Sequence, residues 1–182
     1  MEDALGRNIL PKYANWEHED IVADVDSRRL NYSLLATNIE LDINTCGLMR
    51  TFDSLPGQSF YFYGRRQWNK RAAVGAVAYH RERLFFVKEA NDLNWDQFYV
   101  VGIDNVEGAK SLLEYEWNFD QHVLLCFGQE KGGIPSEIAE KCNDMVFIEQ
   151  QGAIKCLNVN VCCGMILWDY WSKFNRKSLS KD

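Results

Sequence analysis

Apolar residues occur along this chain in short runs, and each run is followed by a polar or amphipathic segment. The clearest run covers residues 123–127 and ends at Gly128. A run of this length that ends at a glycine is typical of a strand buried on both faces of a sheet. Weaker runs also predict strands, at residues 33–41, 59–63, 84–87, 98–103 and 145–148.

Helical patterns alternate with these runs. They predict helices at residues 47–55, 109–117, from 136 onward and 157–174. Residues 72–79 fit either a helical or an extended connection. This alternation predicts an α/β fold, with a mostly parallel sheet that is covered by helices on both faces.

The length of 182 residues fits a single domain with a good core and leaves no room for a second module. We expect an N-terminal arm or short helix at residues 1–30, the domain at 31–176 and a polar tail at 177–182. A mobile extension is the alternative for the N-terminal part. No apolar run approaches the length of a membrane span, and the first residues lack a signal-peptide pattern, so we expect a cytoplasmic protein.

The last predicted helix is apolar on nearly every side. Val161, Met165 and Trp168 lie along one face, and Ile166 and Tyr170 widen the apolar surface beyond what one sheet contact needs. Burial in the core explains part of this pattern. The surplus predicts a subunit interface.

The six cysteines and three histidines do not form a metal-binding pattern. No Cys-x-x-Cys pair is matched by a second pair, and His18, His80 and His122 lie in unrelated contexts. We therefore expect no metal site, and free thiols in a reducing compartment.

The net charge of -6 argues against a general electrostatic capture of nucleic acid. Basic residues nonetheless gather near Trp68 and further along the chain, namely Arg65, Arg66, Lys70, Arg71, Arg81 and Arg83. We expect a local basic face, suited to nucleic acid, on an acidic body.

Gly128 opens a glycine-rich turn between the clearest strand and a predicted helix. Such a turn can bring backbone amides against a ligand. No Lys-Ser or Lys-Thr pair follows the glycines, and the spacing is not that of a dinucleotide fingerprint, which argues against the common phosphate loops. Glu130 would also repel a bare pyrophosphate, so an uncharged or cationic ligand fits this turn better.

Three stretches together resemble the signatures of a known family. Residues 127–135 resemble the second signature of the SpoU (TrmH-like) RNA ribose methyltransferases of the SPOUT superfamily, and residues 156–160 resemble the third. Asn44, six residues before Arg50, fits the first signature. The resemblance extends over most of the chain. 

This resemblance implies a SPOUT fold with a deep C-terminal trefoil knot, a homodimer formed through the last helix, and S-adenosylmethionine as methyl donor. The residues that it places in the donor cleft are Ile103, Gly128, Glu130, Ile148, Cys156, Leu157 and Asn158. Taken singly, Ile103, Ile148 and Leu157 fit ordinary core positions, and only their convergence with Gly128 favours a binding role. The alternative for Glu130 is a solvated acid in a loop. Asn158 could tie the last helix to the first signature, and simple capping of the helix is its alternative.

Arg50 is the residue that we expect to carry catalysis. A guanidinium with a pKa above about 12 is a poor base, so our hypothesis is that Arg50 grips an RNA phosphate and stabilises the developing alkoxide. Asn44 would orient Arg50 or the ribose, with helix capping as its alternative role. A salt-bridged surface arginine is the alternative for Arg50. The residues expected to contact RNA are Arg50, Arg65, Arg66, Lys70 and Arg71.

These expectations favour an S-adenosylmethionine-dependent RNA 2′-O-methyltransferase that acts on tRNA as a compact dimer. The small size resembles the minimal members that modify the anticodon wobble position. Cys156 and Asn160 depart from the family, which commonly has serine at both positions, and they suggest the alternative of a catalytically silent RNA-binding or scaffold protein. The presence of Asn44, Arg50 and Glu130 favours the enzyme.

Overall fold

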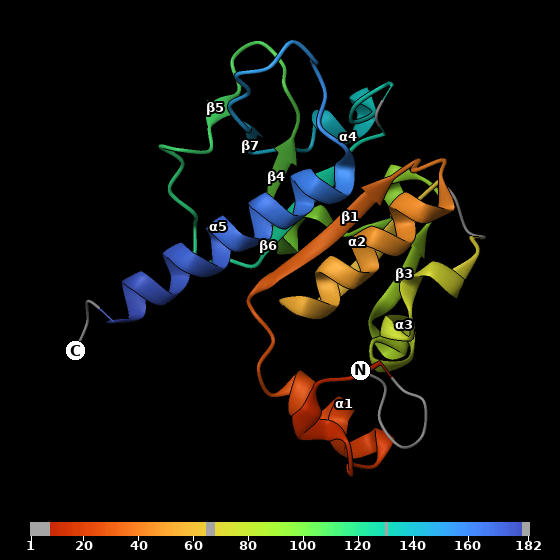
Figure 1. The fold of residues 1–182 in the computed structure, drawn as a ribbon. Helices are drawn as coiled ribbons and strands as arrows, with labels where there is room; N and C mark the ends of the chain where they lie inside the picture. Colours follow the sequence, from red (N-terminus) through yellow and green to blue (C-terminus); the bar gives the residue numbers. More distant parts are fainter. Residues whose placement is uncertain (1–7, 65–67, 130, 180–182) are drawn as a thin grey trace.

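The protein forms one parallel sheet in a computed structural model that describes residues 8–64, 68–129 and 131–179. The described residues contain seven strands in the order β3-β2-β1-β6-β4-β7-β5 (Figure 1), and each neighbouring pair is parallel. The strands are β1 (Tyr32–Thr37), β2 (Ser59–Tyr63), β3 (Leu84–Val87), β4 (Tyr99–Ile103), β5 (Lys110–Ser111), β6 (Val123–Phe127) and β7 (Asp144–Phe147). The predicted α/β class with a parallel sheet is confirmed. The trefoil knot stays a prediction.

Helices cover both faces of the sheet. They are α1 (His18–Asp26), α2 (Asp42–Ser54), α3 (Ala76–Tyr79), α4 (Ser136–Ala139) and α5 (Val159–Leu179), with short 3-10 turns η1 (Pro11–Tyr13), η2 (Lys70–Ala73), η3 (Arg81–Arg83), η4 (Ala90–Asp92) and η5 (Trp95–Gln97). Helices α2 and α5 lie side by side on one face (Figure 1), and α4 with the η4–η5 segment packs on the other.

The centre of the sheet explains why the run at 123–127 is apolar without interruption. All five residues of β6 are buried, as are all six of β1 beside it. Leu125 points to the face of α2 and α5, whereas Leu124 and Cys126 belong to the cluster on the face of α4. Both faces of the strand therefore need apolar side chains.

The predicted helix at 109–117 is wrong. Residues Lys110–Ser111 form the short strand β5, which pairs with β7, and no helix follows before β6. The ammonium of Lys173 on α5 donates to the carbonyl oxygens of Leu112 and Tyr115 at 3.1 and 2.8 Å. These contacts from another element hold the segment in an irregular course, so tertiary structure overrides the local helical pattern.

The junction between β1 and α2 also differs from the expectation. The strand ends at Thr37 rather than at residue 41, because Asn38 adopts a left-handed conformation with a φ of 50°. Helix α2 already begins at Asp42, so Asn44 lies in its first turn and Arg50 in its third. At 1.5 Å per residue the two residues lie about 9 Å apart along the helix axis.

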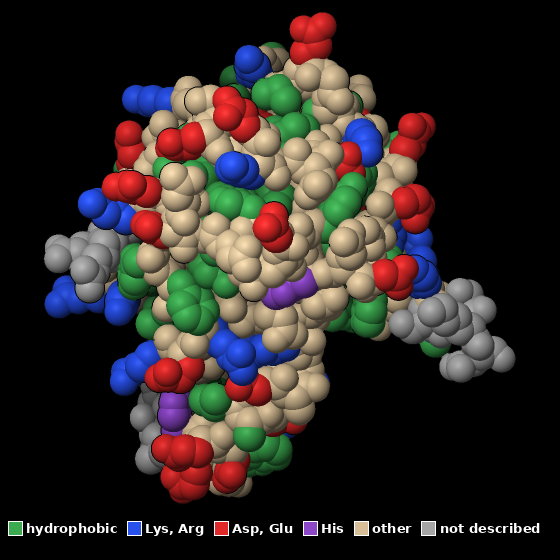
Figure 2. All heavy atoms as spheres, turned by 180° about the vertical axis from the view of Figure 1, so that it is seen from behind, with side chains coloured by type: hydrophobic (Ala, Val, Ile, Leu, Met, Phe, Trp, Pro, Cys, Tyr) green, Lys and Arg blue, Asp and Glu red, His purple; other side chains and the backbone are tan. Residues whose placement is uncertain are grey.

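The surface carries charges of both signs. Figure 2 shows Lys, Arg, Asp and Glu side chains interspersed over the face seen from behind.

Among the described residues, no helix is long and apolar enough to cross a membrane, and no group of His, Cys, Asp and Glu could hold a metal ion. All six cysteines are free thiols.

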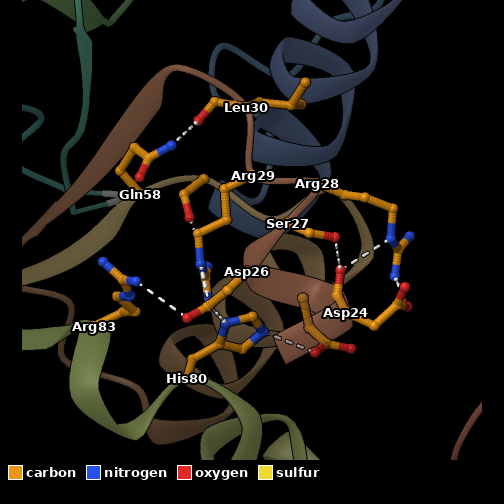
Figure 3. Close-up of polar contacts among 11 residues, drawn as sticks. Asp24, Asp26, Ser27, Arg28, Arg29, Leu30, Gln58, His80 and Arg83 are labelled. Atoms are coloured by element: carbon orange, nitrogen blue, oxygen red, sulfur yellow. Dashed lines mark hydrogen bonds and ion pairs between the residues drawn. The ribbon is translucent and has the colours of Figure 1, made fainter. Parts of the chain in front are cut away.

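Polar contacts join the N-terminal helix α1 to the domain (Figure 3). Arg29 donates to Asp26 at 2.6 Å and to the Nδ1 atom of the buried His80 at 3.2 Å. His80 donates through Nε2 to Asp53 on α2 at 2.8 Å, and Arg83 pairs with Asp26 at 3.1 Å. Helix α1 is therefore tied to α2 and η3 through these contacts.

Gly47 sets the distance between α2 and α5. A Cβ atom at this position would lie 2.4 Å from the side chain of Asn160, so a larger residue would displace that side chain from its hydrogen bond to Asn44. We expect Gly47→Ala to lower the free energy of unfolding by about 1–3 kcal/mol, as overpacking does. Urea denaturation measures this change, and Gly152→Ala is the matched control because a Cβ atom at Gly152 meets nothing within 4 Å. Equal stability of the two variants would contradict the close helix contact.

Candidate active site

A cleft of about 310 Å³ opens at the carboxyl ends of the strands β4, β6 and β7. The residues that line it come from the ends of these strands, from the turn after Gly128 and from the start of α5. Its lining is Ile103, Asp104, Asn105, Val106, Phe127, Gly128, Gln129, Lys131, Gly132, Gly133, Phe147, Ile148, Gln150, Lys155, Cys156, Leu157, Val159 and Cys162. The carboxyl edge is where open parallel α/β sheets bind ligands.

The glycine turn folds back on itself at the wall of this cleft. Gly133 donates its N–H to the carbonyl oxygen of Gln129 at 2.9 Å and has a φ of 64°, a conformation that favours glycine. A Cβ atom at Gly128 would lie 2.1 Å from the carbonyl carbon of Gly133. The turn therefore needs glycine at both positions to keep its main chain at the cleft.

Asp104 connects the end of β4 to the same turn. One carboxylate oxygen accepts from the N–H of Asn105 at 2.8 Å, and the other accepts from the N–H of Ile134 at 3.1 Å. A Cβ atom at Gly133 would lie 2.3 Å from this second oxygen. The carboxylate thus joins the end of the turn at Ile134 to the end of β4.

Helix α4, which follows the turn, is joined to β2 by a short contact between side chains. The hydroxyl of Tyr63 donates to the carboxylate of Glu137. This hydrogen bond, together with burial, raises the pKa of Tyr63 to about 12. The hydroxyl therefore stays a donor at neutral pH, which supports the position of the helix behind the turn.

Three asparagines link the start of α5 to the start of α2. Asn158 caps α5, because its Oδ1 atom accepts from the N–H of Asn160 at 3.0 Å. The Nδ2 groups of Asn158 and Asn160 both donate to the Oδ1 atom of the buried Asn44, at 3.2 and 3.3 Å. Both roles considered for Asn158, capping and tying, are therefore present.

We expect this asparagine cluster to show energetic coupling in a double-mutant cycle. Asn44→Ala leaves two amide donors without this acceptor, so Asn44→Ala and Asn160→Ala should couple by about 1 kcal/mol in the free energy of unfolding. Asn91, an exposed residue of η4, provides the control pair, for which the two effects should add. Additive effects for Asn44 and Asn160 as well would show that their hydrogen bond contributes nothing.

The described lining of the cleft contains three charged side chains. Asp104 is half-buried, whereas Lys131 and Lys155 are exposed. Cys156 is exposed on the same wall. Burial raises the pKa of the Cys162 thiol to about 12, which keeps the Cys162 thiol protonated. The arrangement provides main-chain groups, an apolar floor and one fixed carboxylate.

The structure brings together most of the residues expected in the donor cleft. Ile103, Gly128, Ile148, Cys156 and Leu157 line it. Asn158 does not line the cleft but orients the start of α5 beside it. Glu130 lies outside the described residues.

Arg50 does not line the cleft of its own chain. It contributes instead to a separate hollow of about 430 Å³ between α2 and the N-terminal segment, together with Tyr13, Arg28 and Tyr79. Arg50 is exposed, and its guanidinium makes no hydrogen bond or ion pair with the described residues. The salt-bridged alternative therefore does not apply to the described part of the chain.

Lys70 and Arg71, which are also expected to contact RNA, do not line the cleft. Lys70 and Arg71 are exposed on η2, next to α2. Arg65 and Arg66 lie outside the described residues. Arg83 pairs with Asp26, which partly neutralises the predicted basic face.

Sequence reasoning missed two residues of the site. Asp104 directly follows a predicted strand at the edge where ligands bind, and this position alone could have identified it. The second residue is Asn160. Nothing in the sequence indicates its hydrogen bond to Asn44, because that contact depends on where α2 begins.

The fold and the cleft define an α/β protein that binds a small ligand between two glycine-containing loops at the carboxyl edge of its sheet. The model of the SpoU rRNA Methylase family matches residues 31–168. The chain belongs to this family.

The chain is also similar to individual methyltransferases and to a tRNA modifying enzyme. The chain is 25% identical over 174 residues to the tRNA (guanosine(18)-2'-O)-methyltransferase TARBP1 of Mus musculus, and the match covers 91% of this chain but 11% of that protein. The A. aeolicus TrmH/SpoU tRNA modifying enzyme has a similar structure, with a TM-score of 0.76 and 20% identity over 88% of this chain and 84% of that one. The SpoU methyltransferase AviRb of Streptomyces viridochromogenes in complex with AdoMet has a TM-score of 0.65 and 18% identity, over 78% of this chain and 57% of that one.

Proposed function

We propose that the protein transfers a methyl group from S-adenosylmethionine to a ribose 2′-hydroxyl of RNA, with tRNA as the substrate. The observation that carries this proposal is the cleft between the glycine turn and the start of α5, whose wall is tied through Asn158 and Asn160 to Asn44. The second and third family signatures thus adjoin the cleft, and Asn44 of the first signature lies beside them. Two relatives named above are tRNA enzymes, which supports tRNA as the RNA.

The residues present fit the methyl donor. The volume of about 310 Å³ lies at the lower end of the range for small-molecule sites, and the main chain at Gly128 is bare enough for close approach. Ile103, Ile148 and Leu157 would hold the adenosine part between apolar side chains and backbone groups. When bound, S-adenosylmethionine supplies an electrophilic methyl group on a sulfonium. Cys156 can stand where the family commonly has serine, provided that its contact is made by the main chain.

A second, smaller hollow adjoins the cleft and is suited to the target ribose. It has a volume of about 140 Å³ and shares Gln129, Lys131 and Val159 with the cleft. Asn44 forms part of its wall. A ribose seated there would lie beside the donor and next to Asn44, and such positioning can supply much of the rate.

The active protein is a homodimer formed through α5 in this proposal. Val161, Met165 and Trp168 are exposed large apolar side chains with helical spacing on that helix. Because α2 lies beside α5, a second copy packed on α5 also approaches α2 (Figure 1). Arg50, which faces away from the cleft of its own chain, would then serve the cleft of the partner.

In that position Arg50 would bind the RNA phosphate next to the target and stabilise the developing alkoxide, while phosphate or water accepts the proton. Lys70 and Arg71 would contact the RNA backbone further away, with Arg65 and Arg66. These contacts are electrostatic and release counterions from the phosphates, so they weaken as the salt concentration rises.

The test is methyl transfer with isotope-labelled S-adenosylmethionine and tRNA from cells that lack this chain. The expected product is one 2′-O-methylated nucleoside, identified by mass spectrometry after digestion, which also reveals the position. Binding of the donor and of tRNA without any transfer would overturn the proposal and favour a silent RNA-binding protein.

A further inference from the structure

Asp104 is the one carboxylate on the described lining of the cleft. It follows β4 directly and is half-buried. Lys131 and Lys155 carry the opposite charge, but both side chains are exposed, so water screens them more effectively. The cleft therefore contains one fixed negative charge, with two solvated positive charges on its lining.

The carboxylate is oriented but not neutralised. Its oxygens accept one backbone N–H each, from Asn105 at 2.8 Å and from Ile134 at 3.1 Å, and each oxygen keeps further acceptor capacity. Within the described residues, no lysine or arginine forms an ion pair with it. Two amide donors thus fix the group in place and leave its charge available to a ligand.

The proposed methyl donor and its product differ in charge at one atom. S-adenosylmethionine carries a positive sulfonium, and S-adenosylhomocysteine has a neutral thioether at the same place. A cleft of about 310 Å³ keeps any ligand centre within a Debye length of about 8 Å of its wall. The charge of Asp104 therefore acts on the sulfonium and has no equivalent interaction with the thioether.

We propose that Asp104 determines specificity in the donor cleft, because its carboxylate favours the sulfonium of the methyl donor over the neutral product. This inference rests on the proposed function. It assigns Asp104 two effects that can be separated. Its contact with Ile134 positions the turn and affects both ligands alike, whereas its charge affects only the methyl donor.

The experiment measures the dissociation constants of S-adenosylmethionine and S-adenosylhomocysteine by calorimetry and compares their ratio between variants. In Asp104→Asn the preference for the methyl donor should fall by about tenfold, because an isosteric amide has no net charge. Gly128→Ala, which disturbs the same turn, is the matched control. Its Cβ atom would meet the backbone of Gly133 and Ile134 and not the carboxylate of Asp104, so both ligands should bind more weakly at an unchanged ratio.

The wild-type protein provides a second measurement that needs no variant. Its preference for the methyl donor should decline as added salt shortens the Debye length from about 10 Å at 0.1 M to about 3 Å at 1 M. A preference that rises with salt would show that Lys131 and Lys155 dominate, and it would overturn the inference. An equal change for both ligands in Asp104→Asn would do the same, since it leaves only the effect on the turn. A wild-type protein that binds neither ligand would instead refute the proposed function.

Discussion

Replacing Arg50 by alanine is expected to lower the rate of methyl transfer by at least about 100-fold and to leave the affinity for S-adenosylmethionine unchanged. The guanidinium is exposed, has no partner in the described part of the chain and does not line the cleft of its own chain. Its loss should therefore affect RNA and the transition state but not the donor. Steady-state rates at saturating donor, together with calorimetry, measure the two effects. Lys141→Ala, which removes an exposed cation outside the predicted basic face, should retain the wild-type rate.

Mixed dimers then show on which cleft Arg50 acts. In a heterodimer of Arg50→Ala and Gly128→Val subunits, the first subunit has an intact cleft and the second has an intact arginine. Activity should return if Arg50 serves the cleft of the partner, because one complete site is assembled. An inactive heterodimer would place the arginine in the same chain as its cleft, contrary to its position in the hollow between α2 and the N-terminal segment.

Gly128→Val is expected to weaken binding of S-adenosylmethionine by at least about 100-fold, which corresponds to about 2.7 kcal/mol. A Cβ atom at this position would lie 2.1 Å from the carbonyl carbon of Gly133 and 2.4 Å from the nitrogen of Ile134. Both atoms are backbone, so the turn must move away from the cleft. Calorimetry measures the affinity, and circular dichroism shows whether the fold is kept.

The control for this prediction is Gly152→Val. Gly152 lies in the loop that follows β7, and a Cβ atom there meets nothing within 4 Å. The donor affinity of this variant should remain within about twofold of the wild type, which is less than 0.5 kcal/mol. If both valine variants bind the donor as the wild type does, the turn at Gly128 is not part of the donor site.

The strands could be predicted because a strand that is buried on both faces appears in the sequence as a short, uninterrupted apolar run. The run at 123–127 is apolar throughout, since both of its faces are covered, and the aromatic run at 59–63 forms β2 for a similar reason. The prediction of a helix at 109–117 failed because the backbone of this segment is held by Lys173, a residue far away in the sequence. Contacts of this kind leave no periodic pattern in the segment that they hold.

The lining of the cleft was predicted more completely than the position of Arg50. Gly128 and Leu157 belong to loops that follow strands, and parallel strands bring such loops to one edge. The position of Arg50 depends on where α2 begins. A helix that starts at Asp42 places Arg50 in the third turn, and the six-residue spacing from Asn44 does not show which side of the helix it occupies. Only the structure shows that Arg50 faces another hollow.

A crystal structure of the protein with S-adenosylmethionine tests the central claim most directly. The account predicts density for the donor between the turn at Gly128 and the start of α5, with Ile103, Ile148 and Leu157 around the adenosine part and the sulfonium on the side of Asp104. Density in the hollow beside Arg50, or at any place other than the cleft, would contradict it.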